Sequence, residues 1–186
     1  MRGERMVAEM KDFFDLVRSR ESCRNFSERP VEREKLVRCA EAARLAPSAC
    51  DSQPWEFVAV TGGPLLEGVS ACARALGGNA FTKKCGTFVA VVEKTAILNG
   101  AAGSAPDQKY AKFDMGLSTM LFCLAATEQG LSTCIMGAVD KEGIDRLLQV
   151  KGGDRVFVLI AVGYAADDSL RKKLRKAPDE VLRFAE

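Results

Sequence analysis

Residues 107–137 read DQKYAKFDMGLSTMLFCLAATEQGLSTCIMG. Apolar residues in the first part recur with the 3.6-residue period of a helix, and Asp107 is a residue type that caps helix N-termini. Gly130 is a natural C-terminal stop, because glycine readily adopts the left-handed conformation found there. The stretch therefore predicts the longest helix of the chain. Its periodic apolar residues are Tyr110, Phe113, Leu117, Met120, Leu121 and Leu124.

Apolar, β-branched segments lie on both sides of this helix in the sequence and predict strands. Their ranges are Trp55–Thr61 (WEFVAVT), Thr87–Val92 (TFVAVV) and Arg155–Gly163 (RVFVLIAVG). Further helices are expected from Met6 to about Arg18, from near Pro30 to Pro47, after Gly62-Gly63-Pro64, and over Asp140–Gln149. The segments Ala46–Trp55 and Lys94–Pro106 are expected to be loops. Strict β-α-β-α alternation is missing, so an α+β fold is favoured over a doubly wound sheet.

The 186 residues suit a single domain, and no repeat or low-complexity linker divides residues 1–186. The chain contains no histidine, which excludes Ser-His-Asp and Cys-His devices and His-ligated metals. A net charge of +2 is low for a general nucleic-acid binder. The seven cysteines form no C-x-x-C pair, and no signal peptide or membrane-length apolar run is visible. These features predict a reduced, soluble, cytoplasmic protein.

The common phosphate and nucleophile motifs are also missing from the sequence. There is no G-x-G-x-x-G, no G-x-x-x-x-G-K-[ST] and no G-x-S-x-G. Cysteine spacing fits neither zinc nor iron–sulfur ligation. If the protein is an enzyme, its reactive group is therefore expected to come from a cofactor.

Four segments could carry binding chemistry, and each also has a purely structural interpretation. Residues 18–26 hold three arginines and two serines that suit a phosphate, or form a solvated basic loop. Residues 46–55 combine small and polar side chains that could approach a planar ligand, or form a polar turn. Residues 130–137 could turn backbone amides toward a ring, or form a buried strand between glycines. The basic run Arg171–Lys176 could bind an anion, or simply be solvated.

Taken together and in this order, the four segments resemble the flavin-dependent nitroreductase family. Members carry R-x-S-x-R-x-F after the first helix, P-S-x-x-N-x-Q-P-W before a strand, G-L-x-T-C-x-x-G after the long helix, and a basic tail. The resemblance spans roughly residues 11–184. It implies an α/β/α sandwich with a central, mostly antiparallel sheet, and a homodimer that binds FMN at its interface. Residues 165–186 would be a tail exchanged between the subunits.

The resemblance also implies which residues hold the flavin. Arg20, Ser22 and Arg24 would hold the phosphate and ribityl chain. Arg175 or Lys176 would add a phosphate contact, with Lys173 a weaker candidate. The ring would be bordered by Pro47, Ser48, Ala49, Asp51 and Gln53, in this family usually from the other subunit, and by Met136 and Gly137. Cys134 could lie near the flavin or be a buried small side chain. No protein residue is expected to be catalytic, and no metal is expected.

Two departures from the family pattern bear on function. Asp51 stands where members usually have Asn, and an ionised carboxylate beside the ring would lower the flavin's reduction potential, unless Asp51 is protonated or points away. Lys94–Pro106 is short, which predicts an open, weakly selective pocket.

The implied activity is ping-pong reduction of nitroaromatics, quinones or similar acceptors by NADH or NADPH, with the redox step on the cofactor. The physiological acceptor and the preferred nicotinamide stay open. So do another flavin reaction, such as reductive dehalogenation, flavin fragmentation or ring dehydrogenation, and a non-enzymatic FMN-binding or sequestering role. The basic tail could instead contact an acidic partner, although neither nucleic acid nor membrane is the expected partner.

Overall fold

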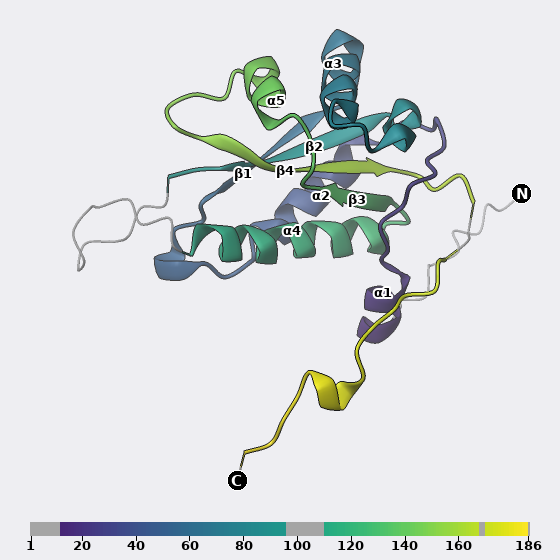
Figure 1. The fold of residues 1–186 in the computed structure, drawn as a ribbon, viewed down its shortest axis with the longest axis vertical. Coiled ribbons are helices and arrows are strands. Elements are labelled where there is room, and N and C mark those ends of the chain that lie inside the picture. Colours follow the sequence, from purple (N-terminus) through teal and green to yellow (C-terminus); the bar gives the residue numbers. More distant parts are fainter. Residues whose placement is uncertain (1–11, 96–109, 168–169, 186) are drawn as a thin grey trace, which may run out of the picture.

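A four-stranded antiparallel sheet with strand order β1-β2-β4-β3 forms the centre of the molecule (Figure 1). The computed structural model describes residues 12–95, 110–167 and 170–185. The strands are β1 (Trp55–Val60), β2 (Thr87–Glu93), β3 (Ser132–Met136) and β4 (Arg155–Gly163). Each residue of the central strand β2 is buried, as expected for a β-branched segment covered on both faces.

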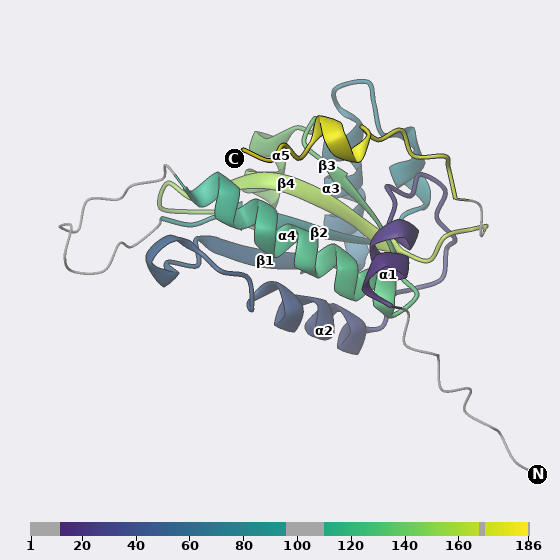
Figure 2. The same ribbon diagram turned by 90° about the horizontal axis from the view of Figure 1, so that it is seen from below.

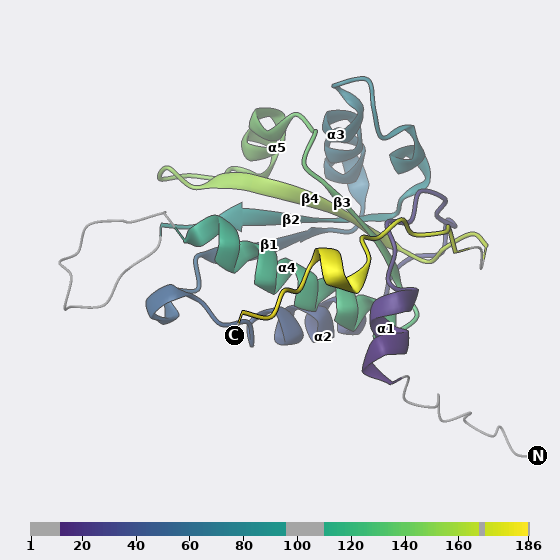
Figure 3. The ribbon, with the colours of Figure 1, turned by 60° about the horizontal axis from the view of Figure 1, so that its bottom comes forward.

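Helices cover both faces of the sheet and make an α/β/α sandwich. Figure 1 shows α3 and α5 above the sheet and α2 and α4 below it. Figure 2 shows α1 beside one end of α4, and Figure 3 shows the three layers from an intermediate angle. The helices are α1 (Phe13–Ser19), α2 (Arg33–Ala43), α3 (Gly63–Arg74), α4 (Ala111–Glu128) and α5 (Lys141–Leu148), with the 3₁₀ turns η1 (Ala49–Asp51), η2 (Ala80–Lys84) and η3 (Pro178–Glu180).

Alternating side chains of the strands fill two separate cores. On β2, Phe88, Ala90 and Val92 pack toward α3 and α5. Val89 and Val91 pack in the second core, toward α2 and α4. In that second core the Phe57 and Phe122 rings stack with centroids 5.2 Å apart, and this contact joins β1 to α4.

The α+β architecture expected from the sequence is confirmed, with differences in detail. The second helix begins at Arg33 rather than near Pro30. The segment between the two glycines of 130–137 is a strand, which adds β3 to the three strands expected. Gly130 has φ +76°, as its role as a helix stop requires. Asp107, most of the expected 94–106 loop and the first turns of the expected Met6–Arg18 helix lie outside the described residues.

The apolar stripe of α4 does not face the sheet. Tyr110 and Phe113 are 50% and 67% exposed, and Met120 is 38% exposed. The helix instead buries a face that mixes small and polar residues with a few large ones. That face consists of Ala111, Asp114, Met115, Ser118, Thr119, Phe122, Cys123 and Ala126.

The C-terminal tail leaves the body past α1 and ends beyond the layer of α2 and α4 (Figure 1). Its large apolar side chains are open to solvent: Leu174 is 85% exposed and Phe184 is 81% exposed. Several large exposed apolar side chains in one segment are typical of an interaction surface. Within the described ranges, no helix combines the length and the apolar character that crossing a membrane requires.

Candidate functional site

The arginine-rich segment 20–24 runs along the free edge of β3. Ser22 pairs with Thr133 in an isolated parallel bridge, and the Cys23 amide donates to the Thr133 carbonyl at 2.9 Å. Cys23 is buried, whereas Arg20 and Ser22 are half-buried and Arg24 is exposed. The strand edge therefore fixes the segment as an extended backbone from which Arg20, Ser22 and Arg24 project.

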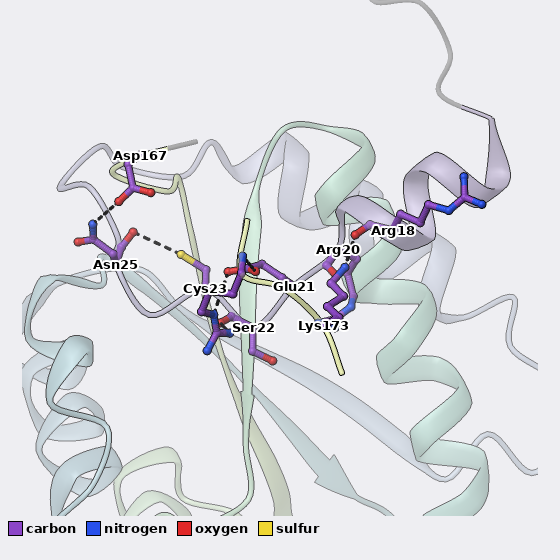
Figure 4. Close-up of polar contacts among 9 residues, drawn as sticks. Arg18, Arg20, Glu21, Ser22, Cys23, Asn25, Asp167 and Lys173 are labelled. Atoms are coloured by element: carbon purple, nitrogen blue, oxygen red, sulfur yellow. Dashed lines mark hydrogen bonds and ion pairs between the residues drawn. The ribbon is translucent and has the colours of Figure 1, made fainter. Parts of the chain in front are cut away.

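The start of the tail runs antiparallel to this segment. Near its base, the Ser27 amide donates to the Tyr164 carbonyl at 2.8 Å and Asn25 Nδ2 donates to Asp167 at 2.6 Å. Further along, Arg171 donates to the Ser22 carbonyl at 2.7 Å. Two distant parts of the sequence are thus joined along their length. Figure 4 shows the contact between Asn25 and Asp167, with Lys173 beside Arg20.

Positive charges gather where the tail passes the end of α1. Lys173 Nζ donates to the main-chain carbonyls of Arg18 and Arg20. The pKa of Lys173 is lowered, mainly by burial and then by the nearby charges of Arg20 and Arg175. Cations that lie close together repel one another, so an anion bound among them is stabilising.

Three arginines lie near enough to the Cys134 thiol on β3 to act on it through their charge. Burial raises the pKa of Cys134, and Arg24, Arg171 and Arg20 oppose that rise by their charge. Cys134 is only 2% exposed, within the core between the sheet and helices α3 and α5. Its placement fits the structural interpretation, a buried small side chain.

Glu21 lies between Arg20 and Ser22 in sequence and pairs with the tail. Its carboxylate accepts the Arg171 amide at 3.1 Å and lies 3.5 Å from Arg171 Nε. A cavity of about 390 Å³ adjoins this pair, between the segment, the start of β3 and the base of the tail. Ser19, Glu21, Cys23, Arg24, Asn25, Ser132 and Arg171 are among its lining residues.

The loop at 47–54 has an unusual backbone. Cys50, Asp51 and Gln53 have φ values of +53°, +52° and +45°, which non-glycine residues rarely adopt. Ser48 Oγ accepts the Gln53 amide at 2.9 Å, and Asp51 Oδ1 accepts Gln53 Nε2 at 3.1 Å. Sparsely populated conformations of this kind concentrate at binding sites.

The structure separates the two predicted halves of the site. The loop leads into Trp55 on the outer strand β1. Trp55 pairs with Glu93 of β2 at one corner of the sheet. Ser22 lies beside Thr133 at the opposite corner, on the outer strand β3. At about 4.8 Å per strand spacing and 3.4 Å per residue, the corners are roughly 25 Å apart. One chain therefore does not bring Pro47, Ser48, Ala49, Asp51 and Gln53 to the arginines.

The remaining predicted residues lie nearer the arginine half. Met136 ends β3 and points into the core between the sheet and α3 and α5, with 4% of its side chain exposed. Gly137 follows at the surface, and a Cβ there would meet no heavy atom within 4 Å. Arg175 and Lys176 are exposed on the tail. The described residues contain no group of His, Cys, Asp or Glu that could hold a metal ion.

Two residues of this region could not be singled out from the sequence. Asp114 is buried on α4 and accepts the Ala49 amide at 3.1 Å, but an aspartate in the first turn of a helix is common for other reasons. Lys173 contacts segment 18–20 directly, whereas the resemblance puts Arg175 or Lys176 first and Lys173 behind them. The six-residue basic run offered no signal that separates its members.

Comparison with known proteins gives a consistent result. The Nitroreductase family profile matches residues 17–76 and 67–164. "Putative NAD(P)H nitroreductase MhqN" of Bacillus subtilis (strain 168) is 27% identical over 205 residues, which cover 94% of this chain and 100% of that protein. A Streptococcus pneumoniae TIGR4 structure described as a nitroreductase family protein is 25% identical with a TM-score of 0.75, covering 93% and 100% of the two chains. A crystal structure described as an oxidoreductase containing FMN is 25% identical with a TM-score of 0.73, covering 82% and 76%.

Proposed function

The chain belongs to the nitroreductase family, and from that premise we propose that it is an FMN-dependent oxidoreductase. NADH or NADPH is the electron donor, and nitroaromatics, quinones or similar electron-poor compounds are the acceptors. When bound, FMN would supply the hydride and electron transfer between the nicotinamide and the acceptor. The chain's own residues bind and orient the cofactor, since without histidine the protein lacks the usual neutral-pH acid–base group.

The observation that carries this proposal is the cation cluster at the end of α1. Arg20 and Arg175 lie close to Lys173, whose pKa is lowered by burial and then by the charges of these two arginines. Guanidinium forks and ammonium groups fit the oxygens of a phosphate, and its charge would relieve their mutual repulsion. The residues present therefore fit the phosphate of FMN, with Arg20, Ser22 and Arg24 as the expected ligands and Arg175 or Lys176 beside them.

We further propose that the site is completed by a second copy of the chain. A single FMN, whose ring and phosphate chain together span less than the roughly 25 Å between the two halves, cannot touch both within one chain. The exposed stripe of α4, including Phe113 and Met120, supplies an apolar face that needs a partner. In a symmetric dimer, the 47–54 loop of one protomer would border the flavin held by the arginines of its partner.

The tail fits the same arrangement. Tyr164, Ala166, Arg171 and Lys173 are hydrogen-bonded to segment 18–27 of their own chain. Beyond that point Leu174, Val181, Leu182 and Phe184 are exposed. An apolar groove between α2 and the free edge of β1, lined by Leu36, Val37, Ala40, Phe57 and Phe122 among others, suits such side chains. We propose that the tail, residues 165–186, crosses to the partner protomer beyond Lys173.

The direct test is a visible absorption spectrum of the purified protein under nitrogen, before and after addition of NADH or NADPH. A flavin spectrum that either donor bleaches, and that nitroaromatics or quinones restore, would support the proposed reaction. Colourless protein that fails to take up added FMN would overturn it. Bound flavin that neither donor reduces would instead favour a sequestering protein, and turnover of halogenated or other substrates alone would favour a different flavin reaction.

A further inference from the structure

Asp114 is a buried carboxylate on the first turn of α4. Only 3% of the residue is exposed, and its negative charge suits the positive end of the helix dipole. Its neighbours on the same helix face are small or apolar residues such as Met115 and Ser118. A charged side chain is rarely buried at such a position without a specific partner.

The partner of Asp114 is the backbone of the 47–54 loop. Oδ2 of Asp114 accepts the Ala49 amide at 3.1 Å, across 65 positions of sequence. A hydrogen bond from an amide to a carboxylate is charge-assisted and stronger than one to a neutral acceptor. The bond therefore ties the start of η1 to the beginning of the long helix.

The loop needs such a tie because its backbone is held in an unfavourable conformation. Directly after Ala49, the residues Cys50, Asp51 and Gln53 all have positive φ. Bonds inside the loop, such as Ser52 N to Ala49 O at 3.1 Å, close its turns. They do not fix where the loop points relative to the rest of the protein. Conformations of this kind persist only when surrounding contacts over-determine them.

We propose that Asp114 is a positioning residue for the flavin site. By holding Ala49, its carboxylate sets the direction in which the Ser48–Gln53 rim projects beyond α4. This inference rests on the proposed function, because that rim would border the flavin bound by the partner protomer. The same helix, α4, presents its exposed apolar stripe to the proposed partner. One rigid helix would therefore both form the subunit contact and position the loop that reaches across that contact.

Three variants separate positioning from folding. Asp114→Ala removes the acceptor, while Asp114→Asn keeps one acceptor oxygen, replaces the other with an NH2 group and removes the charge. Ser118→Ala is the matched control, because Ser118 is buried one turn along the same helix and its hydroxyl donates to the Met115 carbonyl rather than to the loop.

The loop contains its own reporter, the exposed thiol of Cys50. The other six cysteines are buried or half-buried, so a thiol-specific nitroxide attaches first at Cys50. Its mobility, measured by electron paramagnetic resonance on the full-length protein, reports the order of the loop and does not depend on enzyme activity. Thermal unfolding of each variant checks that the fold is intact.

The inference predicts a mobile Cys50 label in Asp114→Ala, together with an FMN dissociation constant raised about tenfold. Asp114→Asn should stay within about threefold of wild type, and Ser118→Ala should match it in both measurements. Equal label mobility in folded Asp114→Ala and wild type would overturn the inference, whether or not FMN binds. Failure of the wild-type protein to take up FMN would overturn the proposed function instead, and a mobile label in Asp114→Ala would still show that Asp114 holds the loop.

Discussion

Lys173 Nζ lies 2.7 Å from the main-chain carbonyl oxygen of Arg20. A lysine of the tail thereby stands beside an arginine that is 153 positions away in sequence and carries the same charge. The carbonyls at the C-terminal end of α1 compensate part of the repulsion, since that end of a helix is negative. Burial, and then the charges of Arg20 and Arg175, lower the pKa of Lys173. A bound phosphate would offset the mutual repulsion of these cations.

Arg20→Met and Lys173→Met should each raise the dissociation constant for FMN about tenfold, equivalent to about 1.4 kcal/mol, through loss of a charge-assisted contact. Binding of riboflavin, which lacks the phosphate, should change far less. Flavin fluorescence titration measures both constants. Arg44→Met is the control, because Arg44 is an exposed arginine paired with Glu41 at 2.6 Å. Equal losses for FMN and riboflavin would contradict a phosphate contact.

Asp51→Asn should raise the reduction potential of the bound flavin. Asp51 is exposed on the loop, and its carboxylate accepts Gln53 Nε2 at 3.1 Å. Beside the ring, its negative charge would disfavour the anionic reduced flavin. An increase on the order of 30 mV corresponds to about 1.4 kcal/mol for two electrons. Spectroscopic redox titration measures the flavin potential of the wild type and of Asp51→Asn. Identical potentials would show that the carboxylate does not act on the ring.

Glu32 should make the fold sensitive to acid. The Tyr164 hydroxyl donates to Glu32 at 2.6 Å and Arg29 donates at 2.9 Å, and these contacts lower the pKa of Glu32 from 4.5 to about 2. Because the folded pKa is the lower one, this stabilisation is present above pH 4.5 and is lost as the pH falls toward 2. Glu32→Gln should therefore flatten the decline of urea-measured stability in that window. Glu34→Gln, at another exposed glutamate of α2, should leave the decline unchanged.

The sequence predicts the elements well where local chemistry decides them. Arg155–Gly163 is observed as β4 with the expected bounds. Asp140 and Gln149, the ends of the expected short helix, cap α5: Asp140 accepts the Gly143 amide at 2.9 Å, and Gln149 has φ +54°. Alternation, capping and turn preferences act within a few residues, so a single sequence contains that information.

Long-range relationships are where the sequence is insufficient. The periodic stripe of α4 indicates a helix but not which side faces the sheet, and Phe113 lies on the outside. The bond between Ala49 and Asp114, and the contacts of Arg171 and Lys173 with segment 18–22, depend on how distant segments meet. The resemblance implies that the two halves of the site come from different subunits, and the structure adds that one chain holds them at opposite corners of its sheet.

Met120→Glu should weaken the proposed dimer and flavin binding together. Met120 lies on the exposed stripe of α4 and is 38% exposed, so a charge there would have to be buried against the partner. Leu147→Glu is a closely matched control, because Leu147 is also 38% exposed but lies on α5, in the opposite layer. Sedimentation velocity at several concentrations, with FMN titration in parallel, should show dissociation for Met120→Glu alone. A dimer unaffected by Met120→Glu would place the subunit contact elsewhere.

Mixed dimers can show directly that each flavin site takes residues from two chains. Arg20→Met/Arg24→Met removes the phosphate half, and Asp51→Gly/Gln53→Gly removes the loop half at two positions whose positive φ suits glycine. Each variant alone should bind FMN weakly. After random reassortment of equal amounts, half of the symmetric dimers are mixed and contain one site with both halves intact. Tight FMN binding should therefore return to about a quarter of the wild-type capacity. If both halves of a site came from one chain, every site in every dimer would remain defective, and mixing would restore nothing.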